Sequence, residues 1–236
     1  MRKFHLIYLV LDVSISMRKP GRHIESPFER FQLLMPDLVL HMREHIQVRT
    51  TCWLSVIAFA SEATTVLPAT SLREIPTVPP LPAAGQTNYA AALKLLRDRI
   101  VADQAEVEAS VRPMVDDDAT IAVRPLVFFV SDGFPYFGTA KQTRSEWLPV
   151  RNELAVPAGP AHIAALGLEG AEEGVLADLA TGEGALINGF IADGTVASGA
   201  LASNVTSAIL DSVARSTQVG TMVIKTPAGM RRVSRR

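Results

Sequence analysis

The stretch from His5 to Met17 reads His-Leu-Ile-Tyr-Leu-Val-Leu-Asp-Val-Ser-Ile-Ser-Met. Its apolar run is typical of a central β-strand covered on both faces, and it ends in Asp12, Ser14 and Ser16. Alternate residues of an extended segment point the same way, so these three oxygen-bearing side chains can converge just beyond the strand. Asp and Ser are hard oxygen ligands, the type that binds Mg²⁺, Mn²⁺ or Ca²⁺. One carboxylate and two hydroxyls do not complete a coordination shell, so the other ligands must come from elsewhere.

The bulk composition is that of a globular protein. The chain has 236 residues, 48% of them hydrophobic and 20% charged, which is enough apolar mass for a single α/β domain over residues 1–236. The formal net charge of −1 provides no overall field that favours nucleic acid or an anionic membrane. No apolar stretch approaches the roughly 18 residues that span a bilayer, and the lone Cys52 excludes a disulfide within the chain. These features predict a soluble, cytoplasmic protein with neither nucleic-acid nor membrane partners.

Apolar strands alternate with amphipathic helices along the sequence. Strands are expected at Leu6–Leu11, Thr51–Ala60, Thr64–Pro68, Leu126–Val130 and His162–Leu168, and near Ala185–Ile187. Helices are expected from Pro27 to about Ile46, at Ala90–Ile100, at about Gln142–Leu154, around Glu172–Leu179 and at roughly Ala200–Val213. Pro36 should kink the first of these helices or remove one of its backbone hydrogen bonds. This alternation predicts an α/β fold with a doubly wound, mostly parallel sheet, helices on both faces and one antiparallel edge strand. A short basic tail, residues 226–236, is expected to be disordered.

Two further segments bring oxygen donors to the same edge of such a sheet. Ser131-Asp132-Gly133 follows an apolar strand, and Thr87 lies in a loop that opens a helix. In doubly wound sheets, sites form outside the carboxyl ends of the strands at the switch point. Each segment also has a purely structural explanation as a turn or a helix cap, and only their combination favours a metal site. The candidate ligands are Asp12, Ser14, Ser16, Thr87 and Asp132.

The order of these parts resembles the metal-ion-dependent adhesion site of von Willebrand factor A-type domains. Asp12-Val13-Ser14-Ile15-Ser16 matches the family pattern Asp-x-Ser-x-Ser, Gly85-Gln86-Thr87 matches its distant Thr, and Ser131-Asp132-Gly133 matches its distant Asp. The resemblance implies that the two serines and the threonine contact a metal, Mg²⁺ or else Mn²⁺ or Ca²⁺. It implies that both aspartates act largely through waters and hydrogen bonds, and that a carboxylate of a partner protein fills the open coordination position. Two departures are Ile15 and Gln86, which stand where glycine is common in the family.

Longer segments resemble the bacterial tellurium-resistance-associated, TerY-like group of these proteins. They are Tyr8–Asp12, Trp53–Phe59, Thr87–Leu93 and Pro125–Gly133, and with the last helix they extend the resemblance over nearly the whole chain. The resemblance implies a protein-binding module rather than an enzyme, in a bacterial stress-response system with a kinase or a phosphatase of the same system as partner. The loop Arg18–Ser26 and the aromatic residues of Phe134–Phe137 are expected to border the metal.

Two enzyme classes are alternatives. His41-Met42-Arg43-Glu44-His45 matches His-x-x-Glu-His, in which two histidines one helical turn apart bind zinc and a glutamate acts as base. A zinc-dependent hydrolase therefore stays open as the second hypothesis. A phosphatase of the haloacid dehalogenase kind needs a second Asp two residues after the first, and Ser14 occupies that position. Glycine-rich nucleotide-binding motifs and a G-x-S-x-G nucleophile motif are absent.

Overall fold

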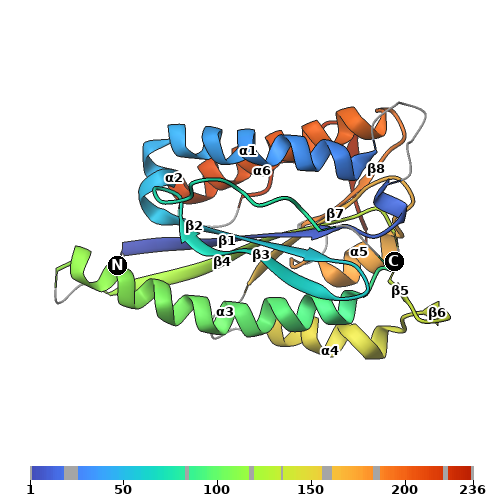
Figure 1. The fold of residues 1–236 in the computed structure, drawn as a ribbon, viewed down its shortest axis with the longest axis horizontal. Helices are drawn as coiled ribbons and strands as arrows, with labels where there is room; N and C mark the ends of the chain where they lie inside the picture. The colour runs from blue at the N-terminus through green and yellow to red at the C-terminus, as the bar shows by residue number, and fades with distance from the viewer. Residues whose placement is uncertain are drawn as a thin grey trace.

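A seven-stranded sheet forms the centre of the computed structural model, which describes residues 2–18, 26–82, 85–116, 120–133, 135–155, 161–182, 187–219 and 223–234 (Figure 1). The strand order is β3-β2-β1-β4-β7-β8-β9, and only the two edge strands, β3 and β9, are antiparallel to their neighbours. The strands are β1 (Arg2–Asp12), β2 (Cys52–Phe59), β3 (Ala63–Ser71), β4 (Ile121–Ser131), β7 (His162–Gly167), β8 (Gly189–Ala192) and β9 (Met230–Arg232). The predicted α/β fold with a mostly parallel sheet is confirmed, but the sheet has two antiparallel edge strands instead of the one predicted, because β9 pairs with β8.

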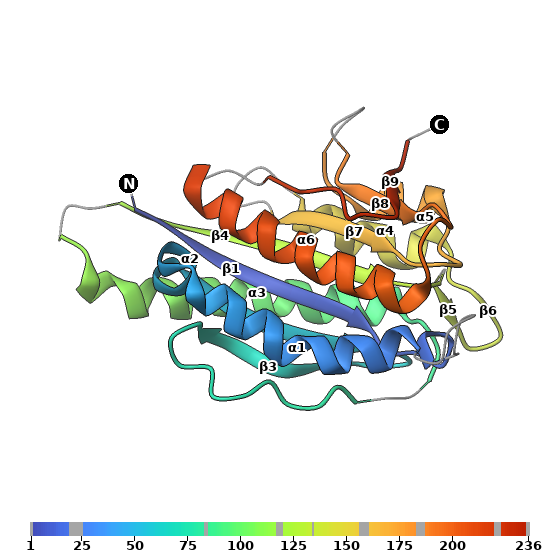
Figure 2. The same ribbon diagram turned by 90° about the horizontal axis from the view of Figure 1, so that it is seen from above.

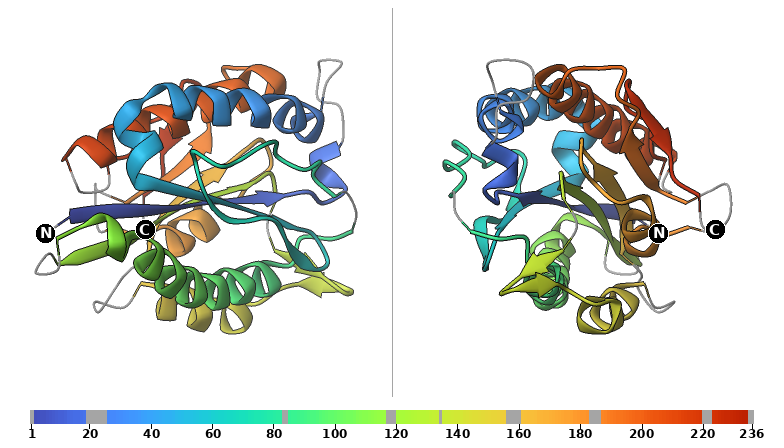
Figure 3. Two further views of the ribbon diagram at one scale, coloured as in Figure 1. Left: turned by 60° about the vertical axis from the view of Figure 1, so that its left-hand side comes forward. Right: turned by 90° about the vertical axis from the view of Figure 1, so that its right-hand side faces the viewer.

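Helices cover both faces of the sheet, as Figure 3 shows from the end. One face carries α1 (Pro27–Glu44), α2 (Ile46–Thr51) and α6 (Ser198–Val219), and the other carries α3 (Tyr89–Val111), α4 (Arg144–Leu154) and α5 (Glu173–Leu179). Two 3-10 turns, η1 (Ser16–Arg18) and η2 (Arg112–Met114), and a small hairpin of β5 (Tyr136–Phe137) and β6 (Ala140–Lys141) complete the described elements. Figure 2 shows α1 and α6 lying side by side above the strands. The expectation of a single domain stays a prediction.

The central position of β1 follows from its continuous apolar sequence. Its alternate residues enter the two separate hydrophobic clusters, with Leu9 on the side of α1 and α6 and Tyr8 on the side of α3. Both neighbours of β1 run parallel to it, with Leu11 opposite Ala58 of β2 and Val130 of β4. The carboxyl ends of these three strands therefore lie at one edge of the sheet, where candidate sites of doubly wound folds form.

Two helix predictions are wrong in their bounds. The helix expected to reach Ile46 ends at Glu44, and α2 begins only after His45, whose φ of −79° and ψ of 105° are extended. Pro36 lies inside α1 and does not end it. The helix expected to stop at Ile100 continues to Val111, because further residues on the same face remain buried against the sheet.

The prediction of a strand near Ala185–Ile187 is also wrong for its described residue, Ile187. The strand in this region, β8, begins only at Gly189. Residues 185 and 186 lie outside the described residues. A side chain at Gly189 would come within 2.5 Å of Val233 Cγ2, so only glycine allows this close packing. Glycine weakens the strand signal in the sequence, and the tertiary contact that requires it is not visible there.

The tail is not disordered in its described part, which ends at residue 234. Met230–Arg232 form β9, which pairs antiparallel with β8. The two terminal guanidinium nitrogens of Arg231 donate to the carboxylate of Glu173 at 2.9 Å. Val233 is only 3% exposed. A three-residue strand shows no usable periodicity, and its arginines resemble those of a solvated end.

Val233→Ala tests whether this tail stabilises the fold. The substitution removes two buried methyl groups, so the free energy of unfolding should fall by about 2 kcal/mol. The measurement is urea unfolding followed by circular dichroism, with Val101→Ala, at a side chain that is 69% exposed, as the matched control. Equal stability of Val233→Ala and wild type would show that the tail does not contribute.

Within the described part of the chain, the helices are all too short or too polar to serve as a membrane span.

Candidate metal centre

The candidate site begins where β1 ends, at the buried carboxylate of Asp12. Its Oδ1 accepts a hydrogen bond from the backbone N–H of Ser14 at 2.9 Å. Its Oδ2 accepts one from the Ser131 hydroxyl, at the end of the neighbouring strand β4, at 2.6 Å. The carboxylate is thus fixed between two parallel strands, and it orients the first residues of the loop after β1.

The two serine hydroxyls of this loop lie next to each other. After Ser14 the chain turns into η1, in which the backbone N–H of Met17 donates to the carbonyl of Ser14 at 3.1 Å. This turn leaves Ser14 Oγ and Ser16 Oγ 3.0 Å apart. Ser16 Oγ also donates to Oδ1 of Asp132 at 2.8 Å. Hydrogen bonds therefore join both carboxylates and the two serine hydroxyls of the predicted set into one connected group.

Thr87 approaches from the loop before α3. Asn88, and not Thr87, caps this helix, since its side chain accepts from the backbone N–H of Ala91 at 3.0 Å. No hydrogen bond of the Thr87 hydroxyl is found among the described residues. A Cβ atom on Gly133 would lie 3.9 Å from Thr87 Oγ1 and 4.0 Å from Ser16 Oγ, so both hydroxyls border the same space beside this glycine.

The Thr87 loop is held by contacts that tie it to the loop after β1. Gly85 has a φ of +93°, and its carbonyl accepts from the backbone N–H of Ile15 at 3.0 Å. The backbone N–H of Gln86 donates to Ser61 Oγ at 3.0 Å, which anchors the loop to the turn between β2 and β3. The glycine is required because a left-handed φ strains other residues and because a Cβ would lie 2.4 Å from Ser61 Oγ.

The electrostatics of the site suit a cation. Burial raises the pKa of Asp12 from 3.8 to about 7, and the nearby Asp132 raises it further, while hydrogen bonds from Ser131 and Ser14 oppose the shift. A buried carboxylate beside a second one is unfavourable in its ionised form unless a positive charge compensates. Three segments of the chain bring oxygen-bearing groups to the position where such a charge would lie. Two of these groups are carboxylates.

The structure brings all five predicted residues to one edge of the sheet. Sequence reasoning missed the contact that Ser131 makes with Asp12 and the pairing of Thr87 with Tyr136 of the small hairpin. The only sequence signal for the contact of Ser131 with Asp12 is a serine directly after an apolar strand. No sequence signal points to the pairing of Thr87 with Tyr136. Of the two segments expected to border the metal, residues 19–25 and Phe134 lie outside the described residues.

The structure does not have the helix geometry that the zinc hypothesis requires. Because α1 ends at Glu44, His45 does not lie on a helix one turn beyond His41, and all three side chains are exposed. In the parts of the chain that the structure describes, no group of three or more His, Cys, Asp or Glu side chains is placed to hold a metal ion. The candidate oxygen site differs from such a cluster because three of its five members are hydroxyls.

Comparison with solved structures gives relatives of low identity and similar fold. Proximal thread matrix protein 1 from the mussel byssus has a TM-score of 0.53 and 20% identity, over 98% of this chain and 49% of that one. The same protein, described with a zinc-occupied MIDAS motif, has a TM-score of 0.50 and 19% identity, over 91% and 46%. The pilus adhesin SpaC from Lactobacillus rhamnosus GG has a TM-score of 0.57 and 12% identity, over 92% and 31%. The chain thus spans about half or less of each of these proteins, and the likeness concerns the fold alone.

Comparison with curated proteins finds no significant match. The model of the von Willebrand factor type A domain matches residues 7–134, which include every candidate ligand and more than half of the chain. The strand order and the helices on both faces agree with this match. The chain therefore belongs to the von Willebrand factor type A domain family.

Proposed function

We propose that this protein binds a partner protein through a divalent metal ion held by Asp12, Ser14, Ser16, Thr87 and Asp132. The observation that carries the proposal is the 3.0 Å separation of Ser14 Oγ and Ser16 Oγ. Two hydroxyl oxygens that lie this close together could occupy neighbouring positions around one divalent ion, and hydroxyls and carboxylates are the hard oxygen ligands that Mg²⁺ and Mn²⁺ accept.

The residues divide into two roles. The hydroxyls of Ser14, Ser16 and Thr87 would hold the metal, and the two aspartates would orient them. Asp12 does so through the backbone of Ser14, and Asp132 through the hydroxyl of Ser16. Uncharged ligands leave the cation with residual positive charge, and the bound ion then attracts a carboxylate from a partner.

The partner is proposed to be a kinase or a phosphatase of a bacterial stress-response system in the cytoplasm. This part of the proposal rests on the resemblance of the segments around Asp12, Thr87 and Asp132 to the TerY-like group. The zinc-occupied MIDAS motif of the mussel protein supports a divalent metal in this family and leaves zinc as a competitor of Mg²⁺. Retention of such a partner on the immobilised protein should require a divalent metal and should be lost in excess chelator.

Calorimetric titration tests the metal site. Chelator-stripped wild-type protein should bind one equivalent of Mg²⁺ or Mn²⁺, and Ser14→Ala should weaken binding by at least about 100-fold because it removes a direct ligand. His41→Ala and the exposed control Ser110→Ala should leave the affinity unchanged.

Two results would contradict this proposal. Equal Mg²⁺ affinity of wild type and Ser14→Ala would exclude the hydroxyl site. Zinc binding that is lost in His41→Ala but kept in Ser14→Ala would instead support a zinc site on α1.

A further inference from the structure

Large apolar side chains are exposed directly beside the candidate ligands. Ile15, which lies between Ser14 and Ser16, is 61% exposed, although its neighbours Val13 and Met17 are buried. Tyr136 of β5, which pairs with the candidate ligand Thr87, is 39% exposed. Exposed apolar side chains that border a polar site are typical of protein-binding surfaces, where they exclude water from the contacts they surround.

The pairing of Thr87 with Tyr136 determines where the tyrosine ring points. The backbone N–H of Thr87 donates to the carbonyl of Tyr136 at 2.9 Å, and that of Tyr136 donates to the carbonyl of Thr87 at 2.8 Å. Two residues that exchange both hydrogen bonds lie directly opposite each other, and their side chains project from the same face. Since the Thr87 hydroxyl borders the site, the Tyr136 side chain leaves the backbone on the face that carries this hydroxyl.

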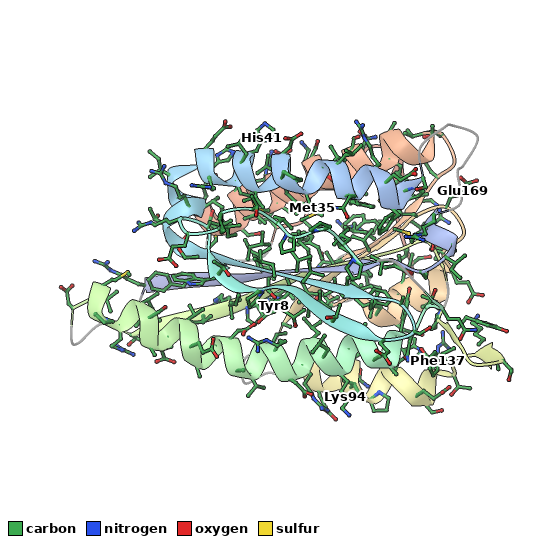
Figure 4. All side chains as sticks on the ribbon, viewed as in Figure 1. Tyr8, Met35, His41, Lys94, Phe137 and Glu169 are labelled. Carbon is green, nitrogen blue, oxygen red and sulfur yellow. The ribbon has the colours of Figure 1, made fainter. Side chains whose placement is uncertain are left out.

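The hairpin that carries Tyr136 is firmly anchored. Gln86 joins it through two hydrogen bonds to Gly138, with Nε2 donating to the carbonyl at 2.9 Å and Oε1 accepting from the N–H at 2.8 Å. The next residue after β6, Gln142, accepts through Oε1 from the backbone N–H of Tyr89 at 2.9 Å. Figure 4 places Phe137 of this hairpin at the end of the molecule to which β1 points. An aromatic side chain held in this way loses little conformational entropy when a partner covers it.

The charged group on the same face of the hairpin is already paired. Lys141 lies opposite Tyr136 across β5 and β6, and its ammonium forms an ion pair with Glu172. A partner rich in acidic residues would have to displace Glu172 to gain this contact. Lys141 thus offers no free positive charge to a partner that covers this face of the hairpin, whereas Tyr136 offers apolar area.

We propose that Ile15 and Tyr136 form two apolar walls of the entrance to the metal site and select a partner segment in which the acidic residue is flanked by large apolar side chains. The inference rests on the proposed function, because the carboxylate of that residue binds the metal. The flanking side chains cover Ile15 on one side and the Tyr136 ring on the other. The site then distinguishes a Leu-Asp-Leu type of segment from an acidic residue in a small or polar context.

Peptide titrations of the Mg²⁺-loaded full chain, followed by NMR, test this preference. The probes are acetyl-Gly-Leu-Asp-Leu-Gly-amide, acetyl-Gly-Gly-Asp-Gly-Gly-amide and, without the carboxylate, acetyl-Gly-Leu-Asn-Leu-Gly-amide. Burial of leucine side chains should make the first probe bind at least about tenfold more tightly than the second. The asparagine probe should bind much more weakly than the first.

Variants locate the preference on the protein. Ile15→Ser and Tyr136→Ser should each bring the affinity ratio of the two aspartate probes towards one. The ratio is read within each variant, so a general loss of metal affinity would affect both probes equally. Phe137→Ser is the matched control, because this 46% exposed ring follows Tyr136 in β5 and projects from the opposite face.

The outcomes separate the two proposals. Equal Mg²⁺-dependent binding of both aspartate probes would overturn the apolar selection and leave the metal-dependent function standing. A preference that persists in Ile15→Ser and Tyr136→Ser would also overturn it. If no probe binds more tightly than the asparagine peptide, carboxylate capture itself fails, and the inference fails with it.

Discussion

Asp12→Asn is expected to weaken Mg²⁺ binding sharply and at the same time to stabilise the metal-free protein at pH 8. The carboxylate is buried, and its two oxygens accept hydrogen bonds from Ser14 and Ser131. Asparagine is nearly isosteric but uncharged, so the site loses half of its carboxylate charge while the buried position no longer holds an ion. The Mg²⁺ affinity should fall by about 10- to 100-fold, as for the loss of a group that orients the metal ligands.

The stability change has a defined dependence on pH. The pKa of Asp12 is raised from 3.8 to about 7 in the folded protein, so between these values the folded state binds more protons than the unfolded state. The free energy of unfolding of the metal-free wild type therefore falls as the pH rises from about 4 to about 7, by up to about 4 kcal/mol. Asp12→Asn lacks this loss, so it should match the wild type near pH 4 and exceed its stability at pH 8.

His5 contributes a slope of opposite sign. Burial lowers its pKa to about 4, so the stability it provides is present above pH 6.5 and is lost as the pH falls towards 4. Because this contribution is common to wild type and variant, it cancels in their difference. The measurement is urea unfolding at several pH values in the presence of chelator, with the exposed Asp98→Asn as the charge-matched control. A stability difference that does not change with pH would contradict the raised pKa of Asp12.

Gly85→Ala is expected to weaken both the fold and the metal site. The φ of +93° disfavours alanine, and the new Cβ would lie 2.4 Å from Ser61 Oγ and 3.0 Å from its backbone nitrogen. Together the backbone strain and the steric clash should lower the free energy of unfolding by about 2–4 kcal/mol. Since the Gly85 carbonyl holds Ile15 and the next residues carry Thr87, the Mg²⁺ affinity should fall as well.

Gly138→Ala separates the effect of backbone strain from the effect of the steric clash. Gly138 has a φ of +70°, but no atom lies within 4 Å of the position of a Cβ atom. In this variant only backbone strain should lower the free energy of unfolding, by about 1 kcal/mol, and the Mg²⁺ affinity should be unchanged. Thermal unfolding and calorimetric Mg²⁺ titration of both variants provide the measurement. Equal effects of the two substitutions would show that the contact with Ser61 does not position the Thr87 loop.

The predicted strands and helices were most accurate where the sequence pattern is long and periodic. Sequence analysis recognises the apolar runs of β1 and β4 and the amphipathic face of α1 directly. Burial on one or both faces determines the residue type at each position of these elements. Boundaries were less accurate. The chain leaves α1 at His45 although hydrophobic residues continue beyond it, and α3 extends through a stretch whose buried face is interrupted by Asp103.

The buried Asp103 shows why such an extension escapes sequence analysis. Its carboxylate accepts a hydrogen bond from the Tyr8 hydroxyl at 2.8 Å and forms an ion pair with Arg99. A carboxylate in a helix is expected to face solvent unless a partner from another element compensates its burial. That partner lies 95 residues away in β1, and only the packing of α3 against the sheet brings the two together.

By itself the sequence determined the fold class and the edge of the sheet at which Asp12, Ser14, Ser16, Thr87 and Asp132 meet, because parallel strands with helical crossovers bring their carboxyl ends together. Only the tertiary structure decided the pairing of Thr87 with Tyr136, the contact of Ser131 with Asp12 and the addition of β9 to the sheet. The physical reason is that these contacts join short segments without periodicity. Their geometry follows from strand register and packing, which no local pattern of residues encodes.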